Sequence, residues 1–360
     1  MLEDHVRTGA YRDAIEGNRA AFEGKVVLDV GAGSGILAIF AARAGAAKVY
    51  AVEATPMAAL ARKLVEANGL SDTIEVIQGT IETVALPEKV DIIVSEWMGY
   101  LLLRESMLDS VLVARDKFLK PGGALYPSHA RLLLAPARSA LGASRSAEFQ
   151  ASMQGWARFA GEAASLYNVD VTALSEAYRA EQRLYFMQTA AWADVHPDDM
   201  LGAAVAVKEY DLLTLTSEEL AAPLNASMRL PLAADGPVDA VVGFFDVEFN
   251  GSPENPAPAP VVLSTAPDAA GATHWGQQVF PLVPPVRAAA GDSLVGSIAL
   301  RRRADNHRMM EVELKTGVDG PSPHAAAGGM GRGWTRSRWS DAGKATSGGA
   351  GGGVQHGVAS

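Results

Sequence analysis

Residues 25–37 read Lys-Val-Val-Leu-Asp-Val-Gly-Ala-Gly-Ser-Gly-Ile-Leu, an apolar run that leads into three alternating glycines. The run over 25–30 predicts a buried strand, and residues 31–35 predict a tight turn into a helix over 36–44. Glycine adopts positive φ and lets the backbone approach a ligand closely. Open parallel sheets place their ligands beside such turns, so this stretch predicts the fold together with the position of a binding site.

The same alternation of strands and helices continues on both sides of this stretch. Further strands are predicted at 48–52, 74–78 and 90–94 and after a turn at 121–123, with helices at 1–20, 56–68 and 106–118. This spacing is typical of a doubly wound parallel sheet. Residues 1–127 are therefore predicted to form an α/β, Rossmann-like domain.

The pattern changes after about residue 128. Strands separated by Pro, Gly and Asn turns are predicted at 131–135, 203–208, 238–249, 261–265, 277–282, 293–302 and 309–316. Such a series indicates a β-sandwich or β-barrel domain over 128–317. From residue 318 to residue 360, Gly, Ala and Ser dominate, and this composition predicts a disordered tail.

One segment of the second half, at about 145–200, is instead predicted to be helical and is rich in aromatic residues. It has two interpretations. It forms a local subdomain with its own small core, or it is an arm that docks on another subunit, because aromatic residues are enriched at interfaces.

Composition limits the kinds of partner and site. The 360 residues include no cysteine, which excludes disulfides and thiolate metal sites, and no metal site is predicted. The sequence predicts no membrane-spanning segment and no leader. The formal net charge of −10 argues against direct nucleic-acid binding and suits a basic partner.

The glycine turn favours one class of cofactor. A dinucleotide fold prefers Gly-x-Gly-x-x-Gly, whereas here the third glycine comes one residue early and Asp29 precedes the turn. Asp29 would repel a pyrophosphate but suits a cationic or zwitterionic cofactor such as S-adenosylmethionine. Glu53, at the end of the next strand, is placed to bind ribose hydroxyls. An NAD-dependent oxidoreductase is a disfavoured alternative.

A second motif follows the strand predicted at 90–94. Residues 95–107 read Ser-Glu-Trp-Met-Gly-Tyr-Leu-Leu-Leu-Arg-Glu-Ser-Met, so Glu96 and Glu105 lie at the two ends of one apolar loop. Two carboxylates at the ligand edge of a sheet suit a guanidinium, whose donors match carboxylates bidentately. The alternative is that both glutamates are solvated or cap a helix.

Together these motifs resemble those of the type I protein arginine N-methyltransferases. The resemblance rests on residues 26–37, on the double-glutamate loop at 95–107, on Thr273-His274-Trp275 and on residues 4–8, Asp-His-Val-Arg-Thr. It covers residues 1–317 and is strongest to the plant-type members with an extended dimerisation arm. It implies a methyltransferase domain that binds S-adenosyl-L-methionine, followed by a β-barrel domain with a helical dimerisation arm.

The resemblance also implies roles for individual residues. The cofactor-binding residues would be Arg7 at the carboxylate, Gly31 and Gly33 at the methionine part, Glu53 at the ribose and Glu82 near the adenine amino group. Asp29 would also belong to the cofactor-binding residues. The catalytic residues would be Glu96, Glu105, His274 and Asp4, the last two as a pair beside the active site. The substrate-binding residues would be Glu96, Glu105, Met107 and Trp275.

Simpler interpretations exist for three of these residues. His274 could be an ordinary barrel histidine, Met107 could fill the core, and Arg7 could be a solvated helix charge.

The implied activity is methylation of arginine in proteins such as histones and Gly-Arg-rich proteins, giving monomethyl and asymmetric dimethyl arginine. A homodimer and a nuclear and cytoplasmic location are also implied. One alternative is a catalytically impaired scaffold or dimerisation module, because the family's N-terminal aromatic segment is missing from this sequence. Another is a methyltransferase that acts on a small molecule.

Overall fold

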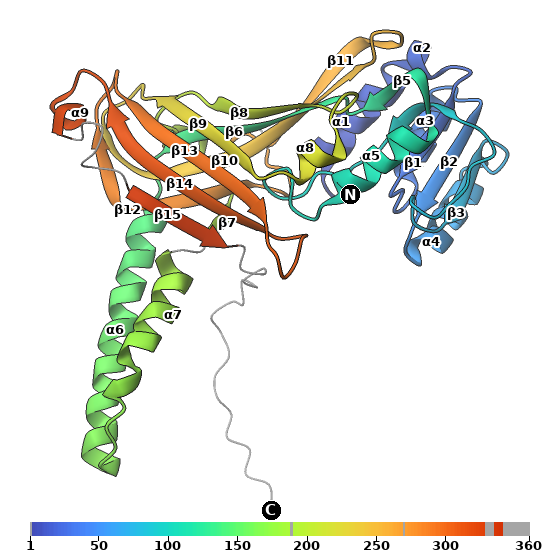
Figure 1. Ribbon diagram of the computed structural model, residues 1–360. Helices are drawn as coiled ribbons and strands as arrows, with labels where there is room; N and C mark the ends of the chain where they lie inside the picture. Colours follow the sequence, from blue (N-terminus) through green and yellow to red (C-terminus); the bar gives the residue numbers. More distant parts are fainter. Residues whose placement is uncertain (1, 188–189, 269–270, 328–334, 341–360) are drawn as a thin grey trace, which may run out of the picture.

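The computed structural model describes residues 2–187, 190–268, 271–327 and 335–340. Its first part is a parallel sheet with helices packed against it (Figure 1). The elements are α1 (His5–Glu16), α2 (Arg19–Phe22), β1 (Val26–Val30), α3 (Ile36–Arg43), β2 (Lys48–Glu53), α4 (Met57–Ala67), β3 (Ile74–Gln78), β4 (Val90–Val94), α5 (Met107–Phe118) and β5 (Leu119–Tyr126).

The strand order of this sheet is β3-β2-β1-β4-β5, and every neighbouring pair is parallel. The chain builds outward from β1 to β3 and then returns to the other side of β1 with β4. The direction of winding therefore reverses between β1 and β4, and ligands of such sheets bind beyond the carboxyl ends of the strands at this point. The glycine turn follows β1 and the loop with Glu96 follows β4, so both motifs lie at this switch point.

The second part is an antiparallel β domain made of two sheets. The first has the order β7-β12-β10-β6-β8, with β11 beside β10, and the second has the order β15-β14-β13-β9. The strands are β6 (His129–Ala137), β7 (Ala191–Ala193), β8 (Val205–Asp211), β9 (Leu224–Pro231), β10 (Gly236–Gly251), β11 (Pro256–Ser264), β12 (Gln277–Ala288), β13 (Ser293–Arg302), β14 (Met310–Asp319) and β15 (Thr335–Ser340). Two short helices, α8 (Ser217–Ala221) and α9 (Pro323–Ala327), complete it. The predicted fold class, a Rossmann-like domain followed by a β-barrel domain with an arm, is confirmed.

A pair of long helices projects from the β domain (Figure 1). α6 (Ala140–Tyr167) and α7 (Ser175–Met187) pack against each other, with a short 3-10 turn over Thr172–Leu174 between them. Trp156 lies inside this arm, where it stacks on Tyr178 at 4.5 Å and donates a hydrogen bond to Ser175. Residues of about 145–200 were predicted to be mostly helical, and α6 and α7 account for most of this range. Near its end, residues 191–193 form β7, which pairs with the barrel strand β12.

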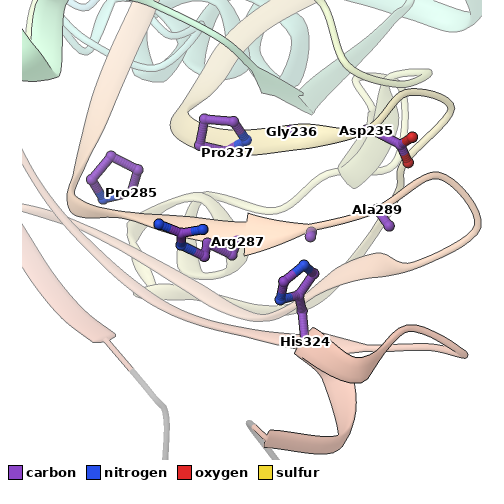
Figure 2. Close-up of a pocket in the computed structure, with 8 residues that line it drawn as sticks. Asp235, Gly236, Pro237, Pro285, Arg287, Ala289 and His324 are labelled. Atoms are coloured by element: carbon purple, nitrogen blue, oxygen red, sulfur yellow. The ribbon is translucent and has the colours of Figure 1, made fainter.

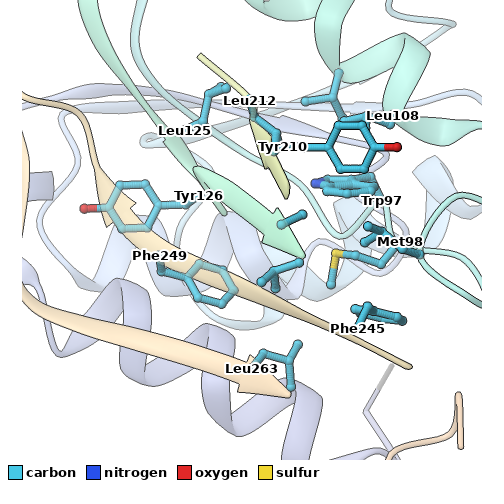
Figure 3. Close-up of a cluster of buried hydrophobic side chains, with 14 of the residues drawn as sticks. Trp97, Met98, Leu108, Leu125, Tyr126, Tyr210, Leu212, Phe245, Phe249 and Leu263 are labelled. Atoms are coloured by element: carbon cyan, nitrogen blue, oxygen red, sulfur yellow. The ribbon is translucent and has the colours of Figure 1, made fainter. Parts of the chain in front are cut away.

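The two domains share one hydrophobic core. Figure 3 shows Trp97 and Met98 of the first domain in one buried cluster with Phe245 and Leu263 of the second. Tyr11 of α1 is completely buried and packs edge-on against Phe249 of β10, with ring centroids 4.8 Å apart. Asn18 adds polar contacts, because its side chain exchanges two hydrogen bonds with the backbone of Ala259. Burial of these apolar side chains stabilises the interface between the two domains.

Besides β7, the strands β9 and β15 were missed by the sequence prediction. In β9 only Met228 and Leu230 are buried, and the polar residues between them weaken the apolar pattern. The prediction of a disordered tail from residue 318 was wrong at the end of β14, at α9 (Pro323–Ala327) and at residues 335–340. Residues 335–340 form β15, which pairs antiparallel with β14 from Glu311 to Thr316. A polar segment forms a strand here because a distant edge supplies its hydrogen bonds. The rest of the predicted tail at 328–334 and 341–360 lies outside the described residues.

Among the described residues, none of the helices combines the length and the apolar character that crossing a membrane requires.

Candidate active site

A cavity of about 300 Å³ opens at the carboxyl ends of the first three strands. Its lining includes Gly31 after β1, Glu53 at the end of β2, Gly79 and Glu82 after β3, and Met107 at the start of α5. This is the edge at which the sequence placed the cofactor. Asp29, Gly33 and Arg7, which were also predicted to bind it, are not among the lining residues.

Glu53 is held in a fixed orientation at one side of this cavity. Its two carboxylate oxygens accept hydrogen bonds from the backbone N–H groups of Gly33 and Thr55, each at 2.8 Å. Because each carboxylate oxygen has a second lone pair, both can still accept from vicinal hydroxyls. This arrangement fits the ribose of S-adenosylmethionine, and Gly33 contributes by orienting Glu53.

Gly31 and Met107 meet at the other side of the cavity. Gly31 has φ of 73°, and a Cβ atom placed on it would lie 2.1 Å from the Cε atom of Met107. The glycine is therefore required both for its backbone conformation and for the space it leaves. Glu82 lies at the exposed rim, where Ser110 donates a hydrogen bond to it at 2.7 Å.

Asp29 does not line the cofactor cavity. Its side chain is completely buried under the turn, where it accepts a hydrogen bond from the N–H of Ala38 in α3 at 3.0 Å. Burial raises the pKa of Asp29 to about 7, with a further contribution from the charge of Glu53. In this structure Asp29 connects the end of β1 to the start of α3 through this hydrogen bond.

The loop with the two glutamates has an unusual backbone. Leu101, Leu102, Glu105 and Ser106 all have φ between 49° and 77°, a region that costs energy for residues with a Cβ atom. Strained backbone of this kind clusters at binding and catalytic sites, where surrounding contacts maintain it. Gly99 adds a tight contact, since a Cβ atom there would lie 1.8 Å from the carbonyl oxygen of Arg104.

Buried side chains from other elements hold this loop in place. Tyr11 of α1 donates a hydrogen bond to the carbonyl of Ser95 at 2.8 Å. Trp275 donates one to the carbonyl of Met98 at 3.2 Å, and its ring packs against Phe245. Trp275 was predicted to bind substrate, but it is only 3% exposed, so it supports the loop from behind.

Glu96 is the more enclosed carboxylate of the loop, with 19% of its side chain exposed. Its Oε2 atom lies 2.9 Å from Nη1 of Arg7, and its buried Oε1 atom has no hydrogen-bond partner among the described residues. Burial raises the pKa of Glu96 to about 7, with Arg7 opposing the shift and Glu105 adding to it. A buried acceptor without a partner is costly, so the site is prepared to accept a further donor.

The structure pairs Arg7 with Glu96, and its predicted contact with the cofactor carboxylate stays a prediction. Its guanidinium also lies over the ring of Trp275, 5.2 Å from the centroid. Arg7 is only 7% exposed, which excludes the interpretation as a solvated helix charge.

The predicted pair of Asp4 and His274 is confirmed as a contact. Oδ2 of Asp4 lies 2.7 Å from Nδ1 of His274 and also accepts from its backbone N–H, while Oδ1 caps α1 at Arg7. Burial lowers the pKa of His274, and the positive charge of Arg7 adds to this against the hydrogen bond with Asp4. A neutral His274 then donates Nδ1–H to Asp4 and presents Nε2 to Arg7 at 3.4 Å. The pair joins α1 to the barrel and positions Arg7.

Glu105 is the open carboxylate, with 49% of its side chain exposed. Its nearest cation is Arg308, in the loop between β13 and β14, whose Nη2 atom lies 3.7 Å from Oε2 of Glu105. Trp192 of β7 also contacts this region, with its ring 4.3 Å from that of Tyr100. Sequence reasoning missed Arg308 and Trp192 as neighbours of the site, because no local pattern signals such distant contacts.

A larger cavity, of about 730 Å³, lies in the β domain. Figure 2 shows Asp235, Pro237, Pro285, Arg287 and His324 around it, and none of these belongs to the cofactor cavity or to the glutamate loop. Within the described part of the chain, no cluster of His, Asp and Glu suits a metal ion.

Comparison with known proteins agrees with this geometry. Residues 143–321 match the family model of the arginine methyltransferase oligomerization subdomain, and residues 13–128 match that of the ribosomal protein L11 methyltransferase. A protein arginine N-methyltransferase PRMT10 from Oryza sativa subsp. japonica is 51% identical over 315 residues, which are 87% of this chain and 83% of that protein.

Solved structures show the same relationship. The structure of Arabidopsis thaliana protein arginine methyltransferase 10 has a TM-score of 0.88 and 44% identity, covering 94% of this chain and 96% of the other. The Trypanosoma brucei PRMT1 enzyme-prozyme complex, described with AdoHcy, has a TM-score of 0.75 and 30% identity, covering 95% and 96%. The chain therefore belongs to the protein arginine N-methyltransferase family, a class of S-adenosylmethionine-dependent enzymes, and plant PRMT10 proteins are among its near relatives.

Proposed function

We propose that this enzyme methylates arginine side chains in proteins such as histones and Gly-Arg-rich proteins, giving monomethyl and asymmetric dimethyl arginine. The observation that carries this proposal is the contact of Glu96 with a guanidinium, that of Arg7, at 2.9 Å. The enclosed carboxylate thus binds the functional group of the substrate and has an unpaired oxygen left for a second one.

The residues of the chain have separate tasks in this reaction. S-adenosylmethionine, when bound, supplies a methyl group activated by its sulfonium. Glu53 would hold its ribose, and the turn at Gly31 lets it approach closely. Glu96 and Glu105 bind the substrate guanidinium and draw its positive charge toward the nitrogens they contact, which leaves the remaining nitrogen more nucleophilic. Much of the acceleration then comes from orientation and preorganised charge.

The proposed asymmetric product follows from the surroundings of Met107. This residue is half-buried at the border between the cofactor cavity and the glutamate loop. Its unbranched side chain is flexible, so it can leave room for a second methyl group on the same nitrogen. The protein substrates, and the nuclear and cytoplasmic location that goes with them, stay predictions.

We also propose that the enzyme works as a homodimer in which the arm of one subunit packs on the cofactor domain of the other. The arm lies almost entirely within the matched oligomerization subdomain, and its far end carries exposed apolar residues, among them Leu166 and Tyr167. On the cofactor domain, Met57 and Leu60 of α4 are also exposed. Exposed apolar patches of this kind mark interaction sites.

Methyl transfer from labelled S-adenosylmethionine tests the proposed reaction. We expect label in histone H4 or a Gly-Arg-rich peptide, and asymmetric dimethyl arginine after hydrolysis. Glu96→Gln is the matched control, because it removes the charge and keeps the shape, and it should abolish transfer. Symmetric dimethyl arginine alone would refute the product assignment. A wild-type chain that neither binds the cofactor by calorimetry nor transfers label would favour the scaffold.

A further inference from the structure

The loop between β13 and β14, residues 303–309, comes from the β domain and contacts the glutamate loop. Its carbonyl at Arg308 accepts a hydrogen bond from the N–H of Glu105 at 2.8 Å, and its carbonyl at His307 accepts one from the hydroxyl of Ser106 at 2.7 Å. These two bonds fall on two residues of the glutamate loop with positive φ. The costly conformation of Glu105 and Ser106 is therefore maintained from outside the cofactor domain.

The β13–β14 loop is itself well braced. Arg303 forms a two-pronged contact with Asp305, and its N–H donates to the carbonyl of Met309 at 2.9 Å. Next to the loop, Arg302 of β13 forks onto Asp109 of α5 at 3.1 and 2.7 Å. Paired contacts of an arginine fork fix geometry in two directions. The loop can thus act as a rigid support rather than as a passive neighbour.

The guanidinium of Arg308 adds a charge to this support. It lies 3.7 Å from the Glu105 carboxylate, and both side chains are about half exposed or more, at 62% and 49%. Glu105 consequently has a cation from the β domain on one side and an open side toward solvent. A carboxylate has lone pairs enough to bind a second guanidinium from that open side.

We propose that the β13–β14 loop is a positioning element of the acceptor site, which orients Glu105 for the substrate guanidinium through its backbone contacts and through Arg308. This inference rests on the proposed arginine methylation. Arg308 acts through Glu105 and is a positioning residue. Because the support belongs to the β domain, movement of that domain changes the placement of the acceptor carboxylate directly.

The pH profile of kcat/KM separates this role from simple stabilisation of the fold. Glu96 faces Arg7 and Tyr11 from α1, and Glu105, whose negative charge adds to the rise in the pKa of Glu96. The Asp4–His274 pair contacts Arg7. Arg308 partly neutralises the charge of Glu105. In Arg308→Ala the repulsion grows, so the acid limb of kcat/KM should move to higher pH and kcat/KM at neutral pH should fall about threefold to tenfold.

Two matched variants complete the kinetic experiment. Arg308→Lys keeps the charge and should return the acid limb to its wild-type position. Arg301→Ala removes another exposed arginine of the same hairpin and should leave the profile unchanged. An acid limb that does not move in Arg308→Ala, or that moves equally in Arg301→Ala, overturns the inference while the enzyme remains active.

Hydrogen exchange tests the backbone contacts without any turnover. Replacing residues 304–308 with two glycines should speed exchange of the amides in 99–107, because the N–H of Glu105 loses its acceptor. Arg308→Ala keeps the carbonyl and should exchange like the wild type. Unchanged exchange in the shortened-loop variant overturns the support role. A wild-type chain without methyl transfer would instead count against the proposed function.

Discussion

At the scale of single residues, Glu96 and Glu105 of the glutamate loop (95–107), called the acceptor loop from here on, differ in their surroundings. Glu96 is largely enclosed beside Arg7, whereas Glu105 is half exposed beside Arg308. Burial disfavours the charged form of Glu96, yet binding of a guanidinium requires that form. The enzyme therefore has a carboxylate whose protonation changes near neutral pH and whose charge depends on the cations around it.

This predicts a pH dependence with a definite sign. Because the pKa of Glu96 is raised to about 7, its carboxylate is lost as the pH falls through about 7, and kcat/KM should fall with it. His274 takes up a proton less readily than an ordinary histidine, since burial lowers its pKa. Measurement of kcat/KM from pH 5.5 to 8.5 checks this. A profile that is flat down to pH 5.5 would show that Glu96 ionises at its ordinary value.

A second prediction concerns Gly31 and its contact with Met107. Gly31→Ala should lower the free energy of unfolding by about 1 kcal/mol, because positive φ is costly for an L-residue. It should also weaken cofactor binding, since the added Cβ atom pushes the Met107 side chain into the cavity. Denaturant unfolding and calorimetry measure the two effects.

The contact can be isolated with a double-mutant cycle. In a Met107→Ala background the clash is absent, so Gly31→Ala should weaken cofactor binding less there than in the wild type. The loss of unfolding free energy should be similar in both backgrounds, because it comes from φ. Equal losses of affinity in the two backgrounds would rule out the Met107 contact as the cause.

At the scale of elements, four other segments of the chain contact the acceptor loop. α1 contributes Tyr11, the segment before β12 contributes Trp275, β7 contributes Trp192, and the β13–β14 loop contributes its backbone carbonyls. Trp192 is notable because β7 follows the helices of the arm in the chain and pairs with β12. A short strand, β7, thus connects the arm to the acceptor loop.

Removal of the Trp192 ring tests this connection. Trp192→Ala should lower kcat/KM for a protein substrate by up to about tenfold, since an aromatic pair contributes about 0.5–1.5 kcal/mol beyond its buried area. Trp192→Phe keeps a ring against Tyr100 and should retain most of the activity. Cofactor affinity should not change in either variant. Trp156→Ala changes only the interior of the arm. An equal loss of kcat/KM in that variant would show that the loss does not come from the contact between Trp192 and Tyr100.

The sequence predicts an element well when the signals that create it are local, and poorly when the element depends on residues far away in the chain. β13 was predicted with its observed ends at 293 and 302, and the glycine turn and Glu96 were placed correctly after β1 and β4, because apolar runs and turn residues are local signals. β15 was missed because its sequence is polar and only its pairing with β14 makes it a strand. Arg308 was missed because its contact with Glu105 joins residues far apart in the sequence. The sequence also does not show that the Asp29 side chain, in β1, is completely buried.

At the scale of the whole molecule, the arrangement couples three parts of the chain to one site. The cofactor domain supplies Glu53 and both glutamates, the β domain supplies the supports of their loop, and the arm returns through Trp192. The two domains also share a continuous hydrophobic core, so they are not expected to separate as free units. Contacts made at the end of the arm can therefore influence the acceptor loop.

The arm carries the prediction that belongs to this scale. Leu166 and Tyr167, at the end of α6, are 69% and 73% exposed, which leaves a large apolar surface in the single chain. If this surface packs on α4 of a second subunit, the charged double variant Leu166→Asp/Tyr167→Asp should convert a dimer into a monomer in sedimentation velocity experiments. Leu60→Asp on α4 should do the same from the other side of the interface.

Val262→Asp is the matched control, because Val262 on β11 is 54% exposed and lies outside both surfaces. It should leave the dimer intact. A dimer that survives the arm variant but not Leu60→Asp would place α4 in the interface without the arm, and a wild-type monomer at all concentrations would remove the dimer altogether. One outcome would connect the two experiments: the arm variant is monomeric with a lower kcat/KM, and Trp192→Ala is still a dimer but also has a lower kcat/KM. Subunit contact would then affect the acceptor loop through β7. If the monomeric variant keeps full activity, assembly and catalysis are independent in this enzyme.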